Sequence, residues 1–255
     1  MKLWTLIENT PAEGLAFEHG LSLYLESGGR RIVFDFGQGD AFLENARRMG
    51  IRPEAADLAV LSHGHYDHGG GLGAYLEAAP DMEVYVNQYA FGSHHRSDGS
   101  YIGLDRSLAD HPRVRKVGED VLLAPGVLLA QSSRPPWSSQ GLTRREGERF
   151  LPEDFRHEQY LLIQEGDRRI LVSGCAHRGA AVLLEQFRPH VFIGGLHSSH
   201  MDPEGPDFGE LADALDRSGA KILTCHCTGR RQYDALKARL GDRIGCIPTG
   251  TALEF

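Results

Sequence analysis

Residues 58–71 read LAVLSHGHYDHGGG, an apolar stretch followed by a dense group of polar side chains. Residues 58–61 have the apolar character of a buried strand, and the three glycines at 69–71 mark a turn. Between them, His63, His65, Asp67 and His68 occupy four of six positions. Because such a group has no ordinary packing role, we expect it to form a chemical site where a strand ends.

The composition is that of a folded globular protein, with 41% hydrophobic and 24% charged residues in a chain of 255. This length suits one large α/β domain, and we expect a single domain over residues 1–255. A net charge of −8 gives no general attraction to nucleic acid or anionic lipid, so we expect neither as a partner. The small basic patches are isolated arginine pairs, one of which could bind a substrate phosphate: Arg144–Arg145, Arg168–Arg169 and Arg230–Arg231. The sequence leaves the oligomeric state open.

The ends of the chain and its apolar segments give no sign of secretion or membrane insertion. The start, MKLWTLIENT, has too short an apolar stretch for a secretory signal. The longest apolar run, residues 121–130, is interrupted by Pro125 and Gly126 and is far shorter than a membrane span. We therefore predict a cytoplasmic protein.

The cysteines do not form the pattern of a disulfide framework, and we expect reduced thiols. Cys225 and Cys227 flank His226, which makes them weak candidates for metal binding, since C-x-C alone is a poor signal. The other two cysteines are Cys175 and Cys246.

Short apolar or alternating segments predict strands, and apolar residues three and four apart predict helices. Strands are expected at residues 21–26, 31–35, 58–61, 84–87, 114–117, 127–131, 160–164, 169–172, 191–193 and 221–224. Helices are expected at residues 42–49, 180–187, 208–217 and 232–240. We interpret residues 132–155 as a long irregular loop that could cover a site. The order favours two layers of mixed sheet covered by helices, although one doubly wound sheet has the same order.

Four polar motifs share a position directly after an apolar segment. They are SHGHYDH after LAVL, SGCAH (173–177) after ILV, GGLH (194–197) after VFI, and CHC (225–227) after KILT. In α/β proteins, ligand sites concentrate on the loops beyond the carboxyl ends of strands. We therefore expect the four motifs to meet at one edge of the structure.

The residue types of the first motif point to metal chemistry. Imidazole and carboxylate groups are the ligands of Zn²⁺, and of iron or manganese at hydrolytic sites. His63 and His65 can point at one ion, while Asp67 and His68 are better placed for a second. Two ions about 3.5 to 4 Å apart could together activate a water molecule.

The motif SHGHYDH matches the H-x-H-x-D-H motif of the metallo-β-lactamase superfamily, and IVFDFGQG (32–39) resembles the strand and turn that precede it. The resemblance implies an α/β fold, a four-layer αββα sandwich, with one or two divalent metal ions held by loops of both sheets. Zinc is the metal we expect first, with manganese, iron and magnesium as alternatives. Asp35 would support a ligand and would not bind the ion itself.

A narrower resemblance covers almost the whole chain. In order, EHGLS, FDFGQG, LSHGHYDHGGGL, SGCAHRG, GGLH and HCTG are similar to the branch that includes dihydropterin-6-methyl-aminobenzene-ribofuranosyl-phosphate synthase, an enzyme of methanopterin biosynthesis. This branch also contains many uncharacterised hydrolases, so its motifs do not fix the substrate.

The resemblance assigns ligands residue by residue. His63, His65, Asp67 and His68 take the four ligand positions of the motif, and His226 would complete the ligands of the second ion. Most hydrolases of the superfamily carry a bridging Asp in a Gly-Asp pair, where this chain has Gly174-Cys175. We assign the third histidine of the first ion to His177. Cys175 is either a thiolate ligand or bridge, or a small buried hydrophobic residue.

Two residues are expected to act on the substrate. Asp67 would orient water while binding the ion, and His197 would contact a phosphate or donate a proton, with a structural histidine held by backbone as the alternative. Among the other histidines, His157 could support a ligand. Mostly surface or loop positions are expected for all of these, His19, His94, His95, His157 and His200.

These features lead to a hypothesis and two alternatives. The chain would be a metal-dependent enzyme acting on a small, phosphorylated molecule, either a hydrolase or a synthase-like transferase that releases diphosphate. One alternative is a lactonase, thioesterase or phosphodiesterase, and the other is a non-catalytic metal-binding sensor. An RNA-processing nuclease of this superfamily would need an inserted domain and a basic face, which this acidic chain lacks.

Overall fold

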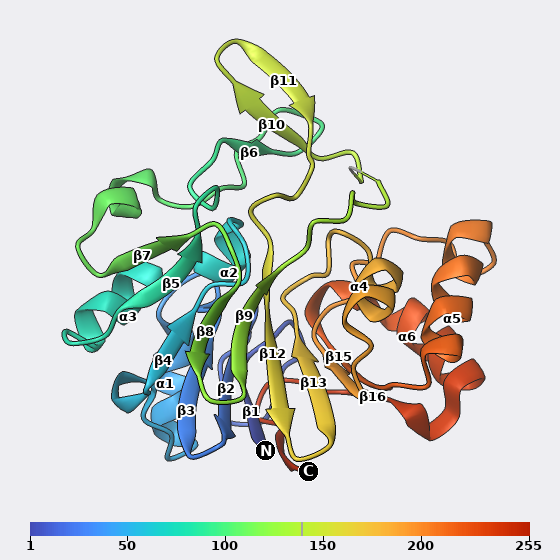
Figure 1. Cartoon of the computed structure of the whole chain (residues 1–255), viewed down its shortest axis with the longest axis horizontal. Coiled ribbons are helices and arrows are strands. Elements are labelled where there is room, and N and C mark those ends of the chain that lie inside the picture. The colour runs from blue at the N-terminus through green and yellow to red at the C-terminus, as the bar shows by residue number, and fades with distance from the viewer. Residues whose placement is uncertain (139) are drawn as a thin grey trace.

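The computed structural model describes residues 1–138 and 140–255, and it contains two seven-stranded sheets that face each other (Figure 1). The first sheet has the order β17-β1-β2-β3-β4-β5-β7 and the second the order β16-β15-β14-β13-β12-β9-β8. Helices α1 (Ala41–Arg48) and α3 (Leu72–Ala78) cover the outer face of the first sheet. Helices α4 (Ala180–Phe187), α5 (Pro206–Ser218) and α6 (Arg230–Leu240) cover that of the second. The result is the predicted four-layer αββα sandwich.

The strands of the first sheet are β1 (Lys2–Ile7), β2 (Ser22–Ser27), β3 (Arg30–Phe34), β4 (Leu58–Val60), β5 (Val84–Asn87), β7 (Val114–Val117) and β17 (Ala252–Glu254). Those of the second are β8 (Val121–Ala124), β9 (Val127–Gln131), β12 (Gln159–Glu165), β13 (Arg168–Val172), β14 (Val191–Ile193), β15 (Lys221–Thr224) and β16 (Ile244–Cys246). Every predicted strand and helix is present, with bounds that differ by at most two residues. The strands β1, β8, β16 and β17 were not predicted.

Three layers of apolar side chains hold the sandwich together. Alternate residues of a strand point to opposite faces, so Ile32 and Phe34 of β3 enter the core between the sheets, whereas Val33 packs under the first helix layer. The third layer lies between the second sheet and helices α4 to α6. The period-2 pattern therefore fixes which side of each strand meets the other sheet.

Parallel pairing directs the important strand ends to one side. Strands β3, β4, β5 and β7 are mutually parallel, and so are β13, β14, β15 and β16. Their carboxyl ends meet along one edge of the sandwich, where the short helix α2 (Tyr66–Gly69) begins directly after His65. The four polar motifs lie on the loops of this edge.

The interpretation of residues 132–155 as irregular is wrong in its second half. Strands β10 (Thr143–Glu146) and β11 (Arg149–Pro152) form a hairpin, and β10 also pairs with β6 (His94–His95). This hairpin projects from the edge that carries the polar loops (Figure 1). The charged sequence TRREGERFLP hides the strand pattern, because both faces of a projecting hairpin are largely solvated.

Within residues 1–138 and 140–255, the structure has no helix with the length and apolar character needed to cross a membrane. The longest helix, α5, has 13 residues and a mixed polar and apolar surface. Its apolar residues, Phe208, Leu211 and Leu215, pack against the second sheet. The helices of this chain therefore serve as covers for the sheets.

A substitution in the core between the sheets should destabilise the whole sandwich. Leu161 on β12 is fully buried, whereas Leu122 on β8 is 68% exposed. We expect Leu161→Ala to lower the free energy of unfolding by about 2–5 kcal/mol, because the cavity it leaves cannot collapse fully. The control Leu122→Ala should change it by less than about 0.5 kcal/mol. Urea unfolding followed by circular dichroism measures both, and equal effects would contradict this packing.

Candidate metal centre

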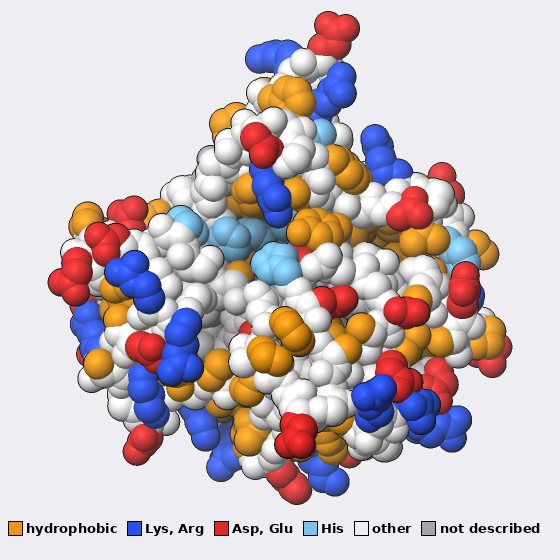
Figure 2. Space-filling view, turned by 180° about the vertical axis from the view of Figure 1, so that it is seen from behind, with side chains coloured by type: hydrophobic (Ala, Val, Ile, Leu, Met, Phe, Trp, Pro, Cys, Tyr) orange, Lys and Arg blue, Asp and Glu red, His pale blue; other side chains and the backbone are white. Residues whose placement is uncertain are grey.

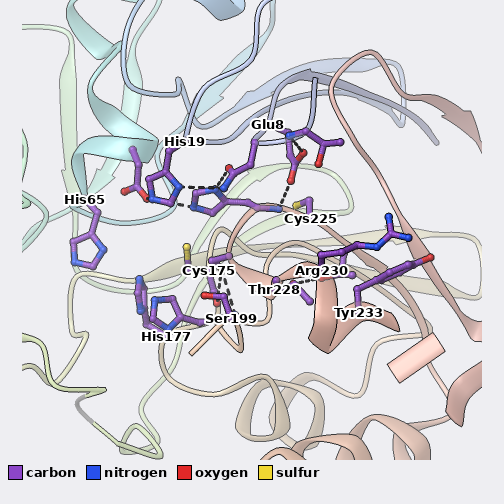
Figure 3. Close-up of a pocket in the computed structure, with 18 of the residues that line it drawn as sticks. Glu8, His19, His65, Cys175, His177, Ser199, Cys225, Thr228, Arg230 and Tyr233 are labelled. Carbon is purple, nitrogen blue, oxygen red and sulfur yellow. Dashed lines mark hydrogen bonds and ion pairs between the residues drawn. The ribbon is translucent and has the colours of Figure 1, made fainter. Parts of the chain in front are cut away.

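A cavity of about 590 Å³ opens at the edge where the parallel strands end (Figure 3). Its walls include residues from each of the four predicted motifs: His65 and Asp67 after β4, Cys175 and His177 after β13, His197 after β14, and His226 after β15. The predicted convergence of these loops is therefore confirmed. Figure 2 shows histidine side chains gathered in a hollow of the surface below the projecting hairpin.

Three imidazole rings form one half of the site. The ring centroids of His63, His65 and His177 are separated by 4.7, 4.8 and 4.9 Å. The Nε2 atom of each ring is buried without a hydrogen-bond partner. Buried polar atoms are almost always paired, so three unpaired nitrogens in one place call for a missing partner. A metal ion is a partner of the right kind, because neutral imidazole is a common ligand of Zn²⁺.

A second group of ligating atoms lies beside the first. The Nε2 atom of His68 is 3.1 Å from the Sγ atom of Cys175 and 3.2 Å from the Nε2 atom of His226. The Nε2 atom of His226 is in turn 3.3 Å from the Oδ2 atom of Asp67. This mixed set of imidazole, carboxylate and thiol also fits a divalent metal ion. The residues predicted for the second ion are therefore together, while their role as ligands stays a prediction.

Cys175 lies between the two groups. Its Sγ atom is within 4.8 Å of ligating atoms of both His63 and His177, and likewise of both His68 and His226. Burial, followed by the neighbouring Cys227, raises the pKa of the Cys175 thiol well above its usual value. The thiol is therefore protonated in the metal-free protein, and binding an ion would release its proton. This position is compatible with a ligand or bridge and with a small buried residue, so both interpretations of Cys175 stay predictions.

The other cysteines contribute less to the site. All four cysteines are unpaired, as predicted, and all four line the cavity. Among the described residues, neither Cys225 nor Cys227 belongs to a group of three ligating atoms close enough to share an ion. The CHC motif therefore supplies His226 to the candidate centre, and its two thiols form part of the cavity wall.

Asp35 supports the centre from behind, in the way the sequence predicts. Its Oδ2 atom is 2.6 Å from the Nδ1 atom of His68 and accepts a hydrogen bond of 2.7 Å from the hydroxyl of Ser62. Its Oδ1 atom accepts a hydrogen bond of 2.7 Å from the backbone N–H of Ser62. A carboxylate behind an imidazole fixes the orientation of the ring and makes it a better ligand.

Hydrogen bonds also orient the rings of three other histidines. The Nδ1 atom of His63 lies 2.8 Å from the Ser62 hydroxyl, that of His177 3.0 Å from Gln140 Oε1, and that of His226 2.7 Å from Asn9 Oδ1. In each case one nitrogen is held by the protein and the Nε2 atom faces the candidate centre. The rings are therefore arranged before any ion binds.

Unusual backbone conformations concentrate at this site. Among the described residues, seven other than glycine have positive φ, and six of them belong to the candidate centre or touch it: Asp35 (65°), Gln140 (55°), Phe155 (51°), Ala176 (54°), His197 (45°) and His226 (51°). Such conformations are uncommon for residues with a Cβ atom, and each costs about 1–3 kcal/mol unless surrounding structure enforces it. The backbone of the strand-end loops is therefore strained at the positions that orient the side chains of the candidate centre.

Three predictions about histidine exposure are corrected. His94, His95 and His157 were expected at surface or loop positions, but all three are buried, the first two on β6. His19 and His200 are exposed, as predicted. His19 is half exposed, yet its Nε2 atom lies 3.3 Å from the Oδ2 atom of Asp67. Its hydrogen bond to Asp67, opposed by partial burial, raises the pKa of His19 above its usual value. The signal for His19 was its place in EHGLS, which only the branch resemblance makes meaningful.

His197 faces the cavity next to the triad of imidazoles formed by His63, His65 and His177. Its ring centroid is 4.2 Å from that of His177, and its Nδ1 atom is buried without a partner. Burial, with smaller effects of His200 and His226, lowers the pKa of His197 to about 3. The ring is therefore neutral near pH 7 and can offer a hydrogen bond to a bound molecule, but it carries no positive charge.

A family model described as the metallo-beta-lactamase superfamily matches residues 16–226, and the chain belongs to this superfamily. Over its whole length, and 97% of the relative's, it is 26% identical to 7,8-dihydropterin-6-methyl-4-(β-D-ribofuranosyl)-aminobenzene-5′-phosphate synthase of Methanocaldococcus jannaschii. The crystal structure of Tm1679, a metal-dependent hydrolase of the β-lactamase superfamily, is 25% identical. The match covers 100% of this chain and 99% of that one, with a TM-score of 0.82.

A shorter match points to a different activity. Over 57 residues, which are 22% of this chain and 21% of the relative, the chain is 40% identical to hydroxyacylglutathione hydrolase of Xanthomonas campestris. Both the superfamily and the branch that the sequence motifs indicate are therefore confirmed. The reaction is not fixed by these likenesses, because the relatives include a synthase and hydrolases.

Removal of one triad histidine should reduce metal binding. We expect His177→Ala to lower the bound metal by about one ion per chain, because an ion in the triad would keep only two imidazole ligands. Elemental analysis of the purified protein, loaded with zinc and desalted, measures the metal content. The control His190→Ala changes an exposed histidine outside the cavity and should retain the full content. Equal metal content in both variants would contradict the assignment.

The buried imidazoles should make the metal-free protein sensitive to acid. Burial, and then neighbouring imidazoles, lower the pKa of His63 and His177 well below 6.5. In the unfolded chain these groups titrate near 6.5, so below that pH the unfolded state binds more protons than the folded state. We expect the thermal midpoint of chelator-treated protein to fall between about pH 7 and about pH 5. A flat profile in calorimetry would contradict this, and His190→Ala should leave the slope unchanged.

Proposed function

We propose that this protein is a metal-dependent enzyme that acts on a small phosphorylated molecule, as a hydrolase or as a transferase that releases diphosphate. The observation that carries the proposal is the meeting of imidazole, carboxylate and thiol side chains from four strand-end motifs at one cavity, whose lining includes the unpaired buried Nε2 atoms of His65 and His177. The cavity volume of about 590 Å³ is typical of sites for small molecules. The full-length similarity to a synthase whose name specifies a 5′-phosphate compound supports the substrate class.

The proposed ligands divide into two sets. His63, His65 and His177 would hold a first ion, and Asp67, His68 and His226 a second, with Cys175 between them. Zinc is the metal we propose first, because the set combines imidazole, carboxylate and thiol. A divalent ion bound there supplies Lewis acidity toward a phosphate or carbonyl oxygen of the substrate.

The residues of the chain then bind and orient the substrate. Asp67 lines the cavity and can accept a hydrogen bond from water or substrate with a carboxylate oxygen that the ion leaves free. Burial alone would raise its pKa, but His68 and the hydrogen bonds from His19 and His226 lower the pKa of Asp67 well below its usual range. It is therefore an acceptor at neutral pH. His197, neutral and at the cavity wall, would contact the reacting group.

Two arginines could provide charge for a substrate phosphate. Arg96, from the loop after β6, and Arg230, at the start of α6, both line the cavity. Arg230 is highly exposed and also contacts Asp234 at 2.9 Å. Of the arginine pairs noted in the sequence, the pair at 230–231 is the one that reaches the cavity wall. Arginine suits phosphate because its planar group can donate two parallel hydrogen bonds.

The proposal is tested by assaying the zinc-loaded protein with three probes. These are a dihydropterin diphosphate together with the aminobenzene ribofuranosyl phosphate, a nitrophenyl phosphodiester, and a thioester. Turnover of the first pair with release of diphosphate would support the transferase, and turnover of the phosphodiester would support a hydrolase of phosphorylated molecules. Turnover of the thioester alone would favour the alternative activity and contradict the proposed substrate class. Metal binding with no turnover of any probe would favour the sensor and contradict the proposal.

The ligand role of His65 makes a sharper prediction. His65→Ala should reduce both metal affinity and kcat/KM by more than about 100-fold, the upper end of what loss of a supporting residue costs. Titration against a chromophoric chelator measures the affinity, and the active probe measures the rate. Unchanged activity in this variant would rule out the proposed centre as the place of reaction.

His197 should affect the reaction without affecting the metal. Because His197 lines the cavity and, among the described residues, belongs to no group of ligating atoms close enough to share an ion, we expect His197→Ala to lower kcat by about 100-fold, within the range for a residue that assists proton transfer, and to keep the metal content. His200→Ala, a change at the exposed neighbour, is the matched control and should keep kcat. A loss of metal in His197→Ala would assign His197 to the ligands instead.

A further inference from the structure

A second group of buried polar side chains lies directly behind the H-x-H turn. It consists of His94 on β6, Glu153 at the end of β11, and His157 before β12. Their exposed fractions are 3%, 2% and 0%. The ring of His157 lies close to two other imidazoles: its centroid is 5.1 Å from that of His65 and 3.9 Å from that of His94. Buried imidazoles and a carboxylate without a catalytic assignment call for a role.

His157 contacts the backbone between two proposed ligands. The N–H of Gly64 donates a hydrogen bond of 2.9 Å to the Nδ1 atom of His157, across 93 positions of sequence. Gly64 is the residue between His63 and His65, so this bond holds the centre of the turn. On its other side, Gly64 is packed so closely that a Cβ atom would lie 2.0 Å from the carbonyl oxygen of Ala90. The turn is therefore fixed from two sides.

His94 and Glu153 hold His157 in turn. The ring of His94 packs on that of His157 with a tilt of 40°. The Nδ1 atom of His94 donates to the Oε2 atom of Glu153 at 2.8 Å, and its Nε2 atom is 3.3 Å from the carbonyl oxygen of Tyr89. The Oε1 atom of Glu153 accepts from the backbone N–H of Asp154 at 3.1 Å and of Phe155 at 3.2 Å. The carboxylate thus anchors the group.

This group is poorly suited to bind an additional ion. One ring nitrogen each of His65, His94 and His157 lie within 4.8 Å of one another, which by distance alone resembles a metal site. However, the Nδ1 atom of His157 already accepts the Gly64 N–H, so the neutral ring carries its proton on Nε2, which is buried without a hydrogen-bond partner and lies 3.9 Å from the Oε1 atom of Glu153. A nitrogen that carries a proton has no lone pair for a metal. The arrangement therefore suits support of the turn.

We propose that His157, backed by His94 and Glu153, is a positioning residue that fixes the H-x-H turn, so that His63 and His65 bind the first ion without rearrangement. The energetic reason is preorganisation: a loop held in its bound shape loses less conformational entropy when the ion binds. The proposal concerns metal affinity and rests on the candidate centre. It does not depend on the reaction.

The same group connects the projecting hairpin to the centre. Strand β10 pairs with β6, which carries His94, and β11 leads directly into Glu153. Leu142, just before β10, lines the cavity. The hairpin is therefore fixed at its base by the residues that support the turn, which explains why a solvated hairpin sits at this place in the fold.

The test compares two substitutions at one position. In His157→Asn the amide oxygen can take the place of Nδ1 as acceptor, whereas His157→Phe fills the space without an acceptor. We expect His157→Phe to weaken zinc binding by about 10–100-fold, the usual effect of losing a supporting partner, and to shift the visible absorption of the cobalt-loaded protein. His157→Asn should stay within about threefold of the native affinity.

The control is His95→Phe, a change at the residue that follows His94 on β6. His95 is buried too, but its nitrogens contact the Ser93 hydroxyl at 2.9 Å and the Gly99 carbonyl at 3.0 Å, away from the turn. It should keep the native zinc affinity and cobalt spectrum. A folded His157→Phe with native affinity and spectrum would overturn the proposal, since the hydrogen bond to Gly64 would then be dispensable.

Two further outcomes are decisive. If His157→Phe does not fold, Glu153→Gln serves instead: it keeps the shape but removes the charge that anchors His94, and native zinc affinity in this variant would overturn the proposal. If His157→Asn binds one zinc ion per chain fewer than the native protein and keeps the remaining ions, then His94, Glu153 and His157 form a metal site themselves. That result would also overturn the proposal that His157 positions the turn. Zinc and cobalt alone are the probes, so absence of turnover with any substrate would contradict only the proposed function.

Discussion

The structure depends on one constraint. Imidazole nitrogens that have no hydrogen-bond partner in the protein must be held close together, buried and uncharged, at the edge where the two sheets meet. The Nε2 atoms of His63, His65 and His177 are buried without hydrogen bonds. In a folded protein this arrangement is costly, and it is stable here only because the two sheets and their helix layers enforce it. Strained backbone at Asp35 and His226 is a second sign of the same cost.

The sandwich meets this constraint through parallel strands. Because β3 and β4 in one sheet and β13, β14 and β15 in the other end at the same edge, the four side chains after β4 need only one or two more from each of the other loops. Around them stands a layer of oriented partners, with Asp35 behind His68 and His157 behind Gly64. The centre is thus assembled from distant segments, yet each ligand is aimed by residues of a rigid scaffold.

The division between recognition and chemistry follows from the cavity. Its lining includes His65, Asp67, Cys175, His177 and His226 of the candidate centre, together with arginine, thiol and tyrosine side chains from loops and from α6. The relatives include a synthase and a hydrolase, so the fold alone does not fix the activity. Specificity in this chain is therefore to be sought in residues such as Arg96 and Arg230.

The sequence by itself determined most of the elements and the first half of the candidate site, because period-2 strands and the cluster at 63–68 are local patterns. It also located Cys175, His177, His197 and His226 as strand-end residues. Only the tertiary structure decided that His94, Glu153 and His157 stand behind the turn, and that His19 reaches Asp67. These contacts join segments far apart in the chain, and no local pattern encodes a distance between two loops. The projecting hairpin escaped prediction for a related reason, since its strands are stabilised by pairing with β6 and not by an apolar face of their own.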